Sequence, residues 1–368
     1  MIRNFSFTFT LLTVLACHAQ EQKQPFGSQP KKINDKANSG LTDESHLKNI
    51  RQLTYGGDNA EAYFSPNGKF VSFQSNNKAW GVKCDQIFSM DIAKAAADSN
   101  YKPVLISTGK GRTTCSYYMP NGNDILYAST HLKNDTCPAV PSEIGKYLWP
   151  IYPEYDIFVA DKKGKIKKQL TNTPGYDAEA TVSPKGDKIV FTSTRSGDLE
   201  LWVMDIDGKN QKQITNELGY DGGAFFSPDG KKIVFRASRP NSEEEIKEYK
   251  YYLEKNLVAP TNMEIYTCNV DGSDLKKITS LGKANWAPFF HPGGNKIIFS
   301  SNHHSKRGYD FQLYMINTDG TGLEQITTES IFNAFPMFSP NGKKLIWSSN
   351  RNNKGTRDTN LFIADWVD

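Results

Sequence analysis

Carboxylate and amide side chains recur just before one repeated strand of this 368-residue chain, and grouped carboxylates can hold a cation or attract a basic partner. Because they occupy similar positions in successive repeats, we expect them to converge on the mouth of a central channel. The formal net charge of the chain is +4, so five carboxylates at one mouth would create a local negative field. Alternatively, Asp177 and Asp221, each in a Gly-Tyr-Asp triplet, only cap turns. The candidate partner-binding residues at this mouth are Asp58, Asn59, Glu61, Asp177, Glu179, Asp221, Asn285, Trp286, Asn333 and Phe335.

Two long segments between strands form a second candidate binding surface. Residues 131–155 are rich in proline and aromatic residues, and residues 240–263 contain a predicted helix with Ser242 as its N-cap. Tyrosine and tryptophan are enriched at protein interfaces, so we expect the two insertions to wall a groove. The alternative is that they only roof the fold. The candidate contact residues here are Tyr147, Trp149, Tyr152 and Tyr249.

No signature of catalysis accompanies these residues. The sequence contains no G-x-S-x-G, H-E-x-x-H or P-loop motif, so no catalytic residue is assigned and binding is expected rather than catalysis. His303 and His304 are adjacent, and adjacent side chains of an extended segment point in opposite directions, so neither a metal site nor a cofactor is predicted. The alternative function is a carbohydrate-active enzyme, of lyase or glycosidase type, or a glycan-binding protein that uses the acidic and aromatic mouth.

The elements that would position these residues repeat six times. A turn with proline and glycine two residues apart precedes an alternating, β-rich run, which predicts a hairpin of two strands. A third strand ends in Asp or Asn, and a fourth ends in a Thr or Ser. The six turns lie at residues 64–69, 118–123, 182–187, 226–231, 290–295 and 338–343.

The order of these strands predicts a closed ring. The chain begins with a spare fourth strand at 50–54, and the last repeat lacks its own fourth strand. If residues 50–54 pair with the strand around 361–365, the ring closes and no open edge remains between its ends. The predicted fold is therefore all-β, a six-bladed β-propeller over residues 49–368, closed by an N-terminal strand that completes the last blade.

The repeat pattern, with LT, FSPDGK, an alternating strand and an apolar strand before DG, resembles the TolB-type propeller repeat, a relative of the WD-type repeats. The resemblance covers residues 50–368 and implies a protein partner that docks at the channel mouth. It departs from TolB in one respect, because TolB has an α/β domain before its propeller. A TolB-like lipoprotein of the bacterial envelope is the better description of this sequence.

The N-terminal residues are interpreted as a targeting segment. Arg3 precedes an apolar stretch that ends in Val14-Leu15-Ala16-Cys17, which resembles a lipoprotein box. We therefore expect a signal peptide at 1–16, a lipidated Cys17 and a flexible tether at 17–48, with the protein anchored in the outer membrane, facing the periplasm or the cell surface. The alternative is an ordinary secretory signal that is cleaved after Ala19.

Cysteine and charge complete the expectations. Export permits disulfides, and Cys84, Cys115, Cys137 and Cys268 allow three full pairings, between which the sequence does not choose. Lysine and arginine are distributed along the predicted turns, so no nucleic-acid partner is expected. The expected partners are an envelope protein and, through the N-terminal lipid, a membrane; a glycan remains the alternative ligand.

Overall fold

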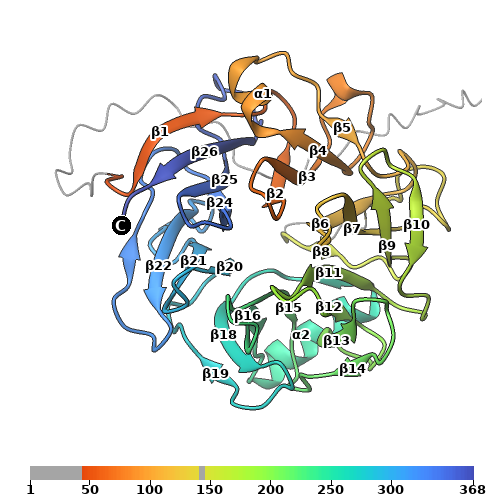
Figure 1. The fold of residues 1–368 in the computed structure, drawn as a ribbon. Helices are drawn as coiled ribbons and strands as arrows, with labels where there is room; N and C mark the ends of the chain where they lie inside the picture. Colours follow the sequence, from red (N-terminus) through yellow and green to blue (C-terminus); the bar gives the residue numbers. More distant parts are fainter. Residues whose placement is uncertain (1–43, 141–145) are drawn as a thin grey trace, which may run out of the picture. The chain divides into compact units, whose positions relative to one another are not determined.

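Six four-stranded antiparallel sheets surround a central axis in the computed structural model, which describes residues 44–140 and 146–368 (Figure 1). The predicted six-bladed propeller is therefore confirmed. The predicted signal peptide, Cys17 and the tether up to residue 43 lie outside the described residues.

Each blade places its first strand in the inner ring and its fourth strand at the outer rim (Figure 1). Blade 1 contains β2 (Asn59–Phe64), β3 (Phe70–Ser75), β4 (Gln86–Asp91) and β5 (Val104–Leu105). Blade 2 contains β6 (Thr113–Tyr118), β7 (Asp124–Ser129), β9 (Asp156–Asp161) and β10 (Ile166–Gln169). Blade 3 contains β11 (Asp177–Val182), β12 (Lys188–Ser193), β13 (Glu200–Asp205) and β14 (Lys212–Gln213). Blade 4 contains β15 (Asp221–Phe226), β16 (Lys232–Ser238), β18 (Met263–Asn269) and β19 (Lys276–Lys277). Blade 5 contains β20 (Asn285–Phe290), β21 (Lys296–Ser301), β22 (Gln312–Asn317) and β23 (Glu324–Gln325). Blade 6 contains β24 (Asn333–Phe338), β25 (Lys344–Ser349), β26 (Asn360–Trp366) and β1 (Leu47–Gln52).

The core lies between neighbouring blades, which cover both faces of each sheet. The second strand of every blade therefore buries almost all of its residues, as in β7 and β12. Its fourth residue is always a large ring with no exposed surface, and burial of such a ring contributes roughly 1.5–3 kcal/mol. The six rings belong to Phe73, Tyr127, Phe191, Phe235, Phe299 and Trp347.

The proline-glycine turns connect the first two strands of each blade. Together with the connections between third and fourth strands, they form one face of the ring, which we call the turn face. Gly186 shows why the motif recurs. Its φ is +72°, and a Cβ atom there would lie 2.5 Å from Cγ of Pro120 in the turn of the preceding blade. Glycine is therefore required by both the backbone conformation and the contact between turns.

The ring closes as expected, because β1 pairs antiparallel with β26. Arg51 faces Ile363 and Gln52 faces Phe362 across the pair, and a register irregularity separates Lys48 from Arg51. The strand begins at Leu47, three residues earlier than the predicted start at residue 50. The N-terminal and C-terminal strands thus share one blade.

A clasp formed by Glu44 fastens the residues before β1 to the ring. The Glu44 carboxylate accepts hydrogen bonds from Arg351 in blade 6 at 3.1 and 3.2 Å and from the backbone N–H of Thr328 at 2.9 Å. The imidazole of His46 stacks on Trp366 with ring centroids 4.8 Å apart. The contacts of the propeller therefore extend N-terminal to the predicted domain boundary at residue 49.

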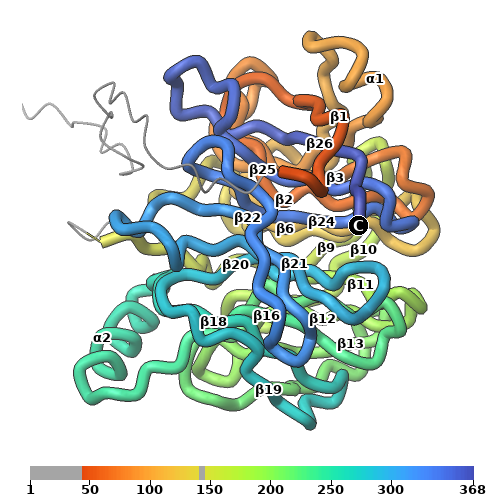
Figure 2. Tube along the Cα trace, turned by 90° about the vertical axis from the view of Figure 1, so that its left-hand side faces the viewer, coloured from red at the N-terminus to blue at the C-terminus, as the bar shows by residue number. Residues whose placement is uncertain are grey.

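Two α-helices and a short 3-10 turn, η1 (Lys78–Trp80), interrupt the strands. The predicted helix is α2 (Glu243–Glu254), and Ser242 caps it in a reciprocal capping box with Glu245. The other helix, α1 (Ile92–Ala97), was not predicted; Asp91 caps it by accepting the backbone N–H of Lys94. The two helices project from opposite faces of the ring (Figure 2). Within residues 44–140 and 146–368, no helix is long and apolar enough to span a bilayer.

Candidate binding face: channel mouth and lid

The loop face, opposite the turn face, carries the connections between second and third strands and between blades. The first residue of most inner strands was predicted to face a partner there. Instead these side chains are buried between adjacent blades, and no more than 1 % of any of them is exposed. We call them the latch residues: Asn59, Asp177, Asp221, Asn285 and Asn333.

Three latch residues bind an arginine of their own blade, namely Asp177, Asp221 and Asn333. Asp177 pairs with Arg195 at 2.6 Å, and Asp221 pairs with Arg239 at 2.5 Å. Asn285 instead donates to the Glu264 carboxylate of the preceding blade at 3.2 Å. The expected field of exposed negative charge at the mouth is therefore not formed by these carboxylates.

The recurrent threonine or serine after each fourth strand belongs to the same network. Its hydroxyl accepts the backbone N–H of the second residue of the third strand, as Thr215 does from Leu201 at 2.8 Å. The same hydroxyl donates to the first residue of that strand, as Thr215 does to Glu200 at 2.5 Å. The repeated LT and IT sequences thus hold the third and fourth strands together, and their role is structural.

Several carboxyl groups of this network have raised pKa values. Burial raises the pKa of Glu200 to about 8, and the neighbouring Asp221 acts in the same direction. Burial also raises the pKa of Asp156 to about 6, with a further contribution from Asp177. The pKa of Glu200 lies above neutral pH, so this carboxyl group retains its proton there, whereas Asp156 takes up a proton only near pH 6 and below.

The third residue of every inner strand adopts a left-handed backbone conformation, with φ between +46° and +61°. A register shift in the pairing of first and second strands occurs at the same place, so these residues form a β-bulge that breaks the alternation of the strand. The resulting bulge ring comprises Glu61, Cys115, Glu179, Gly223, Ala287 and Phe335. Three of its members were among the residues predicted for the mouth, and Cys115, Gly223 and Ala287 were not.

Glu179 is fully engaged within the bulge ring. Its carboxylate binds Arg236 at 2.5 Å, the Tyr220 hydroxyl at 2.6 Å and the backbone N–H of Gly223 at 2.8 Å. Burial alone would raise the pKa of Glu179, but Arg236 and these hydrogen bonds outweigh it and lower the pKa. Glu179 is thus an ionised group that joins blade 3 to blade 4.

Glu61 is the contrasting carboxyl group. Burial raises its pKa from the ordinary 4.5 to about 7; the hydrogen bond with the Cys115 thiol opposes this shift, and the Glu179 carboxylate adds to it. One of its oxygens, Oε2, is buried without a hydrogen-bond partner among the described residues. The native state therefore favours protonated Glu61.

Glu61→Gln is expected to stabilise the protein by about 2–3 kcal/mol at pH 8 and to change little at pH 5. The folded-state pKa of Glu61 lies above its unfolded value, so its stabilising contribution is complete below pH 4.5 and is lost as pH rises through about 7. Urea unfolding of both proteins at the two pH values measures this difference. An equal effect of the substitution at pH 5 and pH 8 would contradict the assignment, and Glu44→Gln serves as the carboxyl control because its pKa is lowered.

Aromatic residues close the channel beyond the bulge ring. The fifth residues of four inner strands meet across the axis, with ring centroids 5.5 Å apart for Tyr63 and Phe225 and 5.1 Å apart for Phe225 and Phe289. Tyr117 completes the group at 5.8 Å from Tyr63. Since Tyr63 and Phe225 come from blades on opposite sides of the ring, these side chains form a plug.

The two predicted insertions join into one lid on the loop face. Two short strands, β8 (Trp149–Pro150) from blade 2 and β17 (Leu257–Val258) from blade 4, pair antiparallel above blade 3. The backbone N–H of Ile151 continues this contact by donating to Asn256 at 2.9 Å, and Lys146 pairs with Glu248 of α2 at 2.6 Å. The structure therefore supports the interpretation that the insertions roof the propeller.

Trp149 lies at the centre of the underside of the lid. The Arg236 guanidinium lies 5.2 Å from the Trp149 ring, and the Trp286 ring lies 5.1 Å from it. Trp286 is itself buried, and its indole N–H donates to the carbonyl of Pro260 at the end of the blade 4 insertion. The lid thus covers the arginine that neutralises Glu179. Tyr152 and Tyr249 are buried in the lid, whereas Tyr147 and Trp149 are half-buried.

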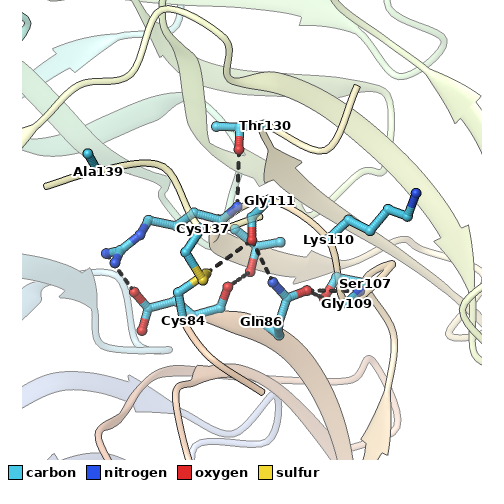
Figure 3. Close-up of a disulfide and its surroundings, with 12 residues drawn as sticks. Cys84, Gln86, Ser107, Gly109, Lys110, Gly111, Thr130, Cys137 and Ala139 are labelled. Atoms are coloured by element: carbon cyan, nitrogen blue, oxygen red, sulfur yellow. Dashed lines mark hydrogen bonds and ion pairs between the residues drawn. A yellow bond between two sulfur atoms is a disulfide. The ribbon is translucent and has the colours of Figure 1, made fainter. Parts of the chain in front are cut away.

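A disulfide fixes the beginning of the blade 2 insertion. Cys84, in the loop of blade 1 between β3 and β4, is bonded to Cys137, and their Cα atoms are 6.0 Å apart. The bond lies beside Gly111, whose carbonyl accepts a hydrogen bond from Gln86 at 3.0 Å (Figure 3). Cys115 and Cys268 are free. The lid is therefore held to blade 1 by a covalent bond and to blade 4 by strand pairing.

The outer surface of the lid is formed largely by α2. Tyr251 is 46 % exposed, and the Lys255 ammonium lies over its ring. A depression of about 370 Å³ separates the helix from the blade 3 loop and the blade 2 insertion. It is lined by Ile151, Thr194, Gly197, Lys250, Leu253, Glu254 and Asn256. Two hollows of this face thus lie beside α2.

Histidines do not gather at the mouth. His303 and His304 both pack beside Tyr314, and His131 packs on Phe158. Across the residues that the structure describes, no group of three or more His, Cys, Asp or Glu side chains is arranged to hold a metal ion. Of the ten residues predicted for the mouth, Asp58 alone is exposed, and the other nine are buried or half-buried.

Known proteins share this architecture. Residues 153–250 match the family model described as TolB beta propeller domain. The putative TolB from Agrobacterium tumefaciens superposes with a TM-score of 0.56 at 19 % identity, covering 87 % of this chain and 97 % of that chain. No curated protein sequence matches the chain.

Two further solved structures show the same fold at low identity. TolB from Acinetobacter baumannii has a TM-score of 0.52 and 19 % identity over 84 % of this chain, but only 63 % of that chain is covered. The gluconolactonase XC5397 from Xanthomonas campestris has a TM-score of 0.56 and 11 % identity over 88 % of this chain and 91 % of that chain. These similarities concern the fold: the chain is a six-bladed β-propeller, and its residues 153–250 resemble the TolB beta propeller domain.

Proposed function

We propose that this chain is a lipid-anchored protein of the bacterial cell envelope that binds a protein partner on its lid. The observation that carries the proposal is the lid itself, because insertions from two blades build one continuous structure on the loop face. The turn face consists mainly of short, similar turns. Loops that depart from a regular scaffold are the usual place for binding residues.

The docking surface in this proposal is the exposed side of α2 with the neighbouring hollow. Tyr251 offers a large exposed ring, and Lys247 and Lys250 offer charges on the same helix. Exposed tyrosine is typical of the few residues that dominate binding energy at protein interfaces. The buried latch residues and Glu179 support this surface from below and do not contact a partner.

Binding rather than catalysis is proposed because no motif of catalysis accompanies the lid. The carbohydrate alternative would require an accessible mouth with acidic and aromatic side chains. Glu179 is held by Arg236, and Trp149 lies over that arginine. The anchor at Cys17 and the outer-membrane location remain parts of the proposal that rest on the sequence.

Photo-crosslinking at position 251 is expected to capture the partner in intact cells, and the same probe at position 275 is expected to capture none. Leu275 is a suitable control because it is 39 % exposed and lies in a turn-face connection of the same blade. Lys250→Ala with Tyr251→Ala should then weaken binding of the captured protein by about tenfold or more. Leu275→Ala with Lys277→Ala should leave the affinity unchanged.

Equal capture at positions 251 and 275 would contradict docking on the lid. Thermal unfolding of each variant shows whether the substitutions disturb the fold, since both sites are exposed. Unchanged affinity in the Lys250–Tyr251 variant, with adducts at 251, would place the energetic contacts elsewhere on the loop face.

A further inference from the structure

The outer rim of blade 2 carries a dense row of lysines. They lie in the turn before β10 and in β10 itself, which is the fourth strand of this blade and an open edge of the ring (Figure 1). All five are exposed: Lys162, Lys163, Lys165, Lys167 and Lys168. Residues 161–168 contain one aspartate beside them, so this segment alone has a formal charge of +4, equal to that of the whole chain.

Few carboxylates compensate this charge. Lys167 pairs with Asp124 at 2.7 Å, and the carboxylate of Asp161 accepts the backbone N–H groups of Lys163 and Lys165. Lys168 donates to a backbone carbonyl, that of Asp207, at 2.6 Å. Among the described residues, Lys162, Lys163, Lys165 and Lys168 form no ion pair.

The rims of the next blades are balanced. Lys209 of blade 3 pairs with Asp207 at 2.9 Å, and Lys276 of blade 4 pairs with Asp274 at 3.0 Å. Lysine on an edge strand also prevents the strand from pairing with other chains. One lysine in β14 and two in β19 are enough for this purpose. β10 itself has two lysines, as β19 has, so the three lysines of the turn before β10 are additional to that requirement.

The composition of this edge indicates the chemistry of its ligand. Protein interfaces are depleted of lysine and enriched in arginine and aromatic residues, and this edge contains neither of the latter. Neither of the two surface hollows described beside α2 includes residues of β10. Several flexible ammonium groups on a convex edge can bind a surface of many anionic headgroups, because each lysine adds separately to the free energy of binding such a surface.

We propose that the rim of blade 2 binds anionic phospholipid headgroups and lays this side of the propeller against an anionic membrane. The proposal is independent of the partner site on the lid, since it uses neither α2 nor the insertions. It is also independent of acylation at Cys17, because the attraction is electrostatic.

Vesicle sedimentation of the full chain tests the proposal. Binding to vesicles that contain phosphatidylglycerol should exceed binding to phosphatidylcholine vesicles and should fall as salt rises. Lys162→Gln, Lys163→Gln and Lys165→Gln together should lower the partition coefficient about fivefold per lysine. The matched control, Lys209→Gln with Lys276→Gln and Lys277→Gln, removes the same charge from the balanced rims and should lower it by less than about twofold.

Three outcomes overturn the proposal. The first is unchanged binding of the blade 2 variant to phosphatidylglycerol vesicles. The second is an equal loss in both variants, which would assign the effect to net charge alone. The third is tighter binding of the protein to polygalacturonate, polyglutamate or duplex DNA than to phosphatidylglycerol at equal anion concentration. Residues 1–43 are identical in all variants, so their contribution to vesicle binding cancels.

Discussion

Replacing Glu44 with alanine is expected to lower the free energy of unfolding by about 3–5 kcal/mol, because it leaves a buried arginine without its carboxylate. Arg351 is 6 % exposed, and Glu44 binds both of its terminal nitrogens. The other nearby carboxylate, Glu329, lies 3.5 Å away but its side chain is 73 % exposed, so it compensates little. Glu44 therefore supplies the main counter-charge.

The comparison with other blades explains why this counter-charge comes from the N-terminal segment. Arg195 and Arg239 are each neutralised by an aspartate at the first position of their own inner strand. Blade 6 has Asn333 at that position, and its amide oxygen accepts from Arg351 at 3.2 Å. The missing aspartate of blade 6 is thus replaced by Glu44, which also ties the chain before β1 to the ring.

Asn333→Asp should for this reason restore at least about half of the stability lost by Glu44→Ala, since it recreates the aspartate–arginine pair of blades 3 and 4. Urea unfolding at pH 7 of the two single variants and the double variant measures the coupling. Burial would raise the pKa of Glu44, but Arg351 and two backbone amides lower it below the ordinary 4.5, so the effect of Glu44→Ala should be complete above pH 4.5 and should shrink as the pH falls through the lowered pKa. Glu329→Ala is the control and should cost less than about 1 kcal/mol. A double variant no more stable than Glu44→Ala would contradict the clasp.

The fold could be predicted from the sequence because its signals are local and repeated. A proline-glycine turn, an alternating strand and a threonine at the end of the fourth strand each follow from a few adjacent residues. Closure followed from the order of the strands, and β1 indeed pairs with β26. The helix α1 was missed because its sequence, IAKAAA, has no apolar periodicity and only Asp91 as a cap.

The side chains of the candidate site were harder to place, because their orientation depends on neighbouring blades. Asp177 looks like a turn residue in the sequence, yet its carboxylate is buried against Arg195, which lies eighteen residues later, just after the end of β12. The bulge at Glu61 and Glu179 breaks the alternation that would predict their direction. Six non-consecutive residues with positive φ, of which one is glycine, give no signal in a single sequence.

The way in which the two insertions join in the lid could not be predicted from the sequence either. Both insertions and the capped helix were predicted, but β8 and β17 contain two residues each and pair across more than a hundred positions. The choice of Cys84 and Cys137 among three pairings also depends on this arrangement. The lysines of blade 2 were interpreted as scattered because their concentration becomes apparent only when β10 is seen as an open edge.

Cys84→Ser with Cys137→Ser is expected to lower the free energy of unfolding by up to about 4 kcal/mol, the chain-entropy value for a closed loop of this size. The two cysteines are 53 residues apart, so the bond restricts a long segment of the unfolded chain. It also joins blade 1 to the start of the blade 2 insertion, whose other end is held by the β8–β17 pairing, the Lys146–Glu248 pair and the packing of Trp149 on Arg236 and Trp286. Loss of the bond should therefore loosen the lid before the blades unfold.

Two measurements separate the global from the local effect of this bond. Urea unfolding gives the change in stability, and limited proteolysis should show new cleavage within residues 131–148 while the blades stay intact. Cys115→Ser is the matched control, because Cys115 lies in the bulge ring and forms no disulfide; it should produce no new cleavage in the insertion. If the double variant resists protease as the native protein does, strand pairing with blade 4 suffices to hold the lid. Cleavage confined to the insertion would instead show that the covalent bond to blade 1 keeps the proposed docking surface in place.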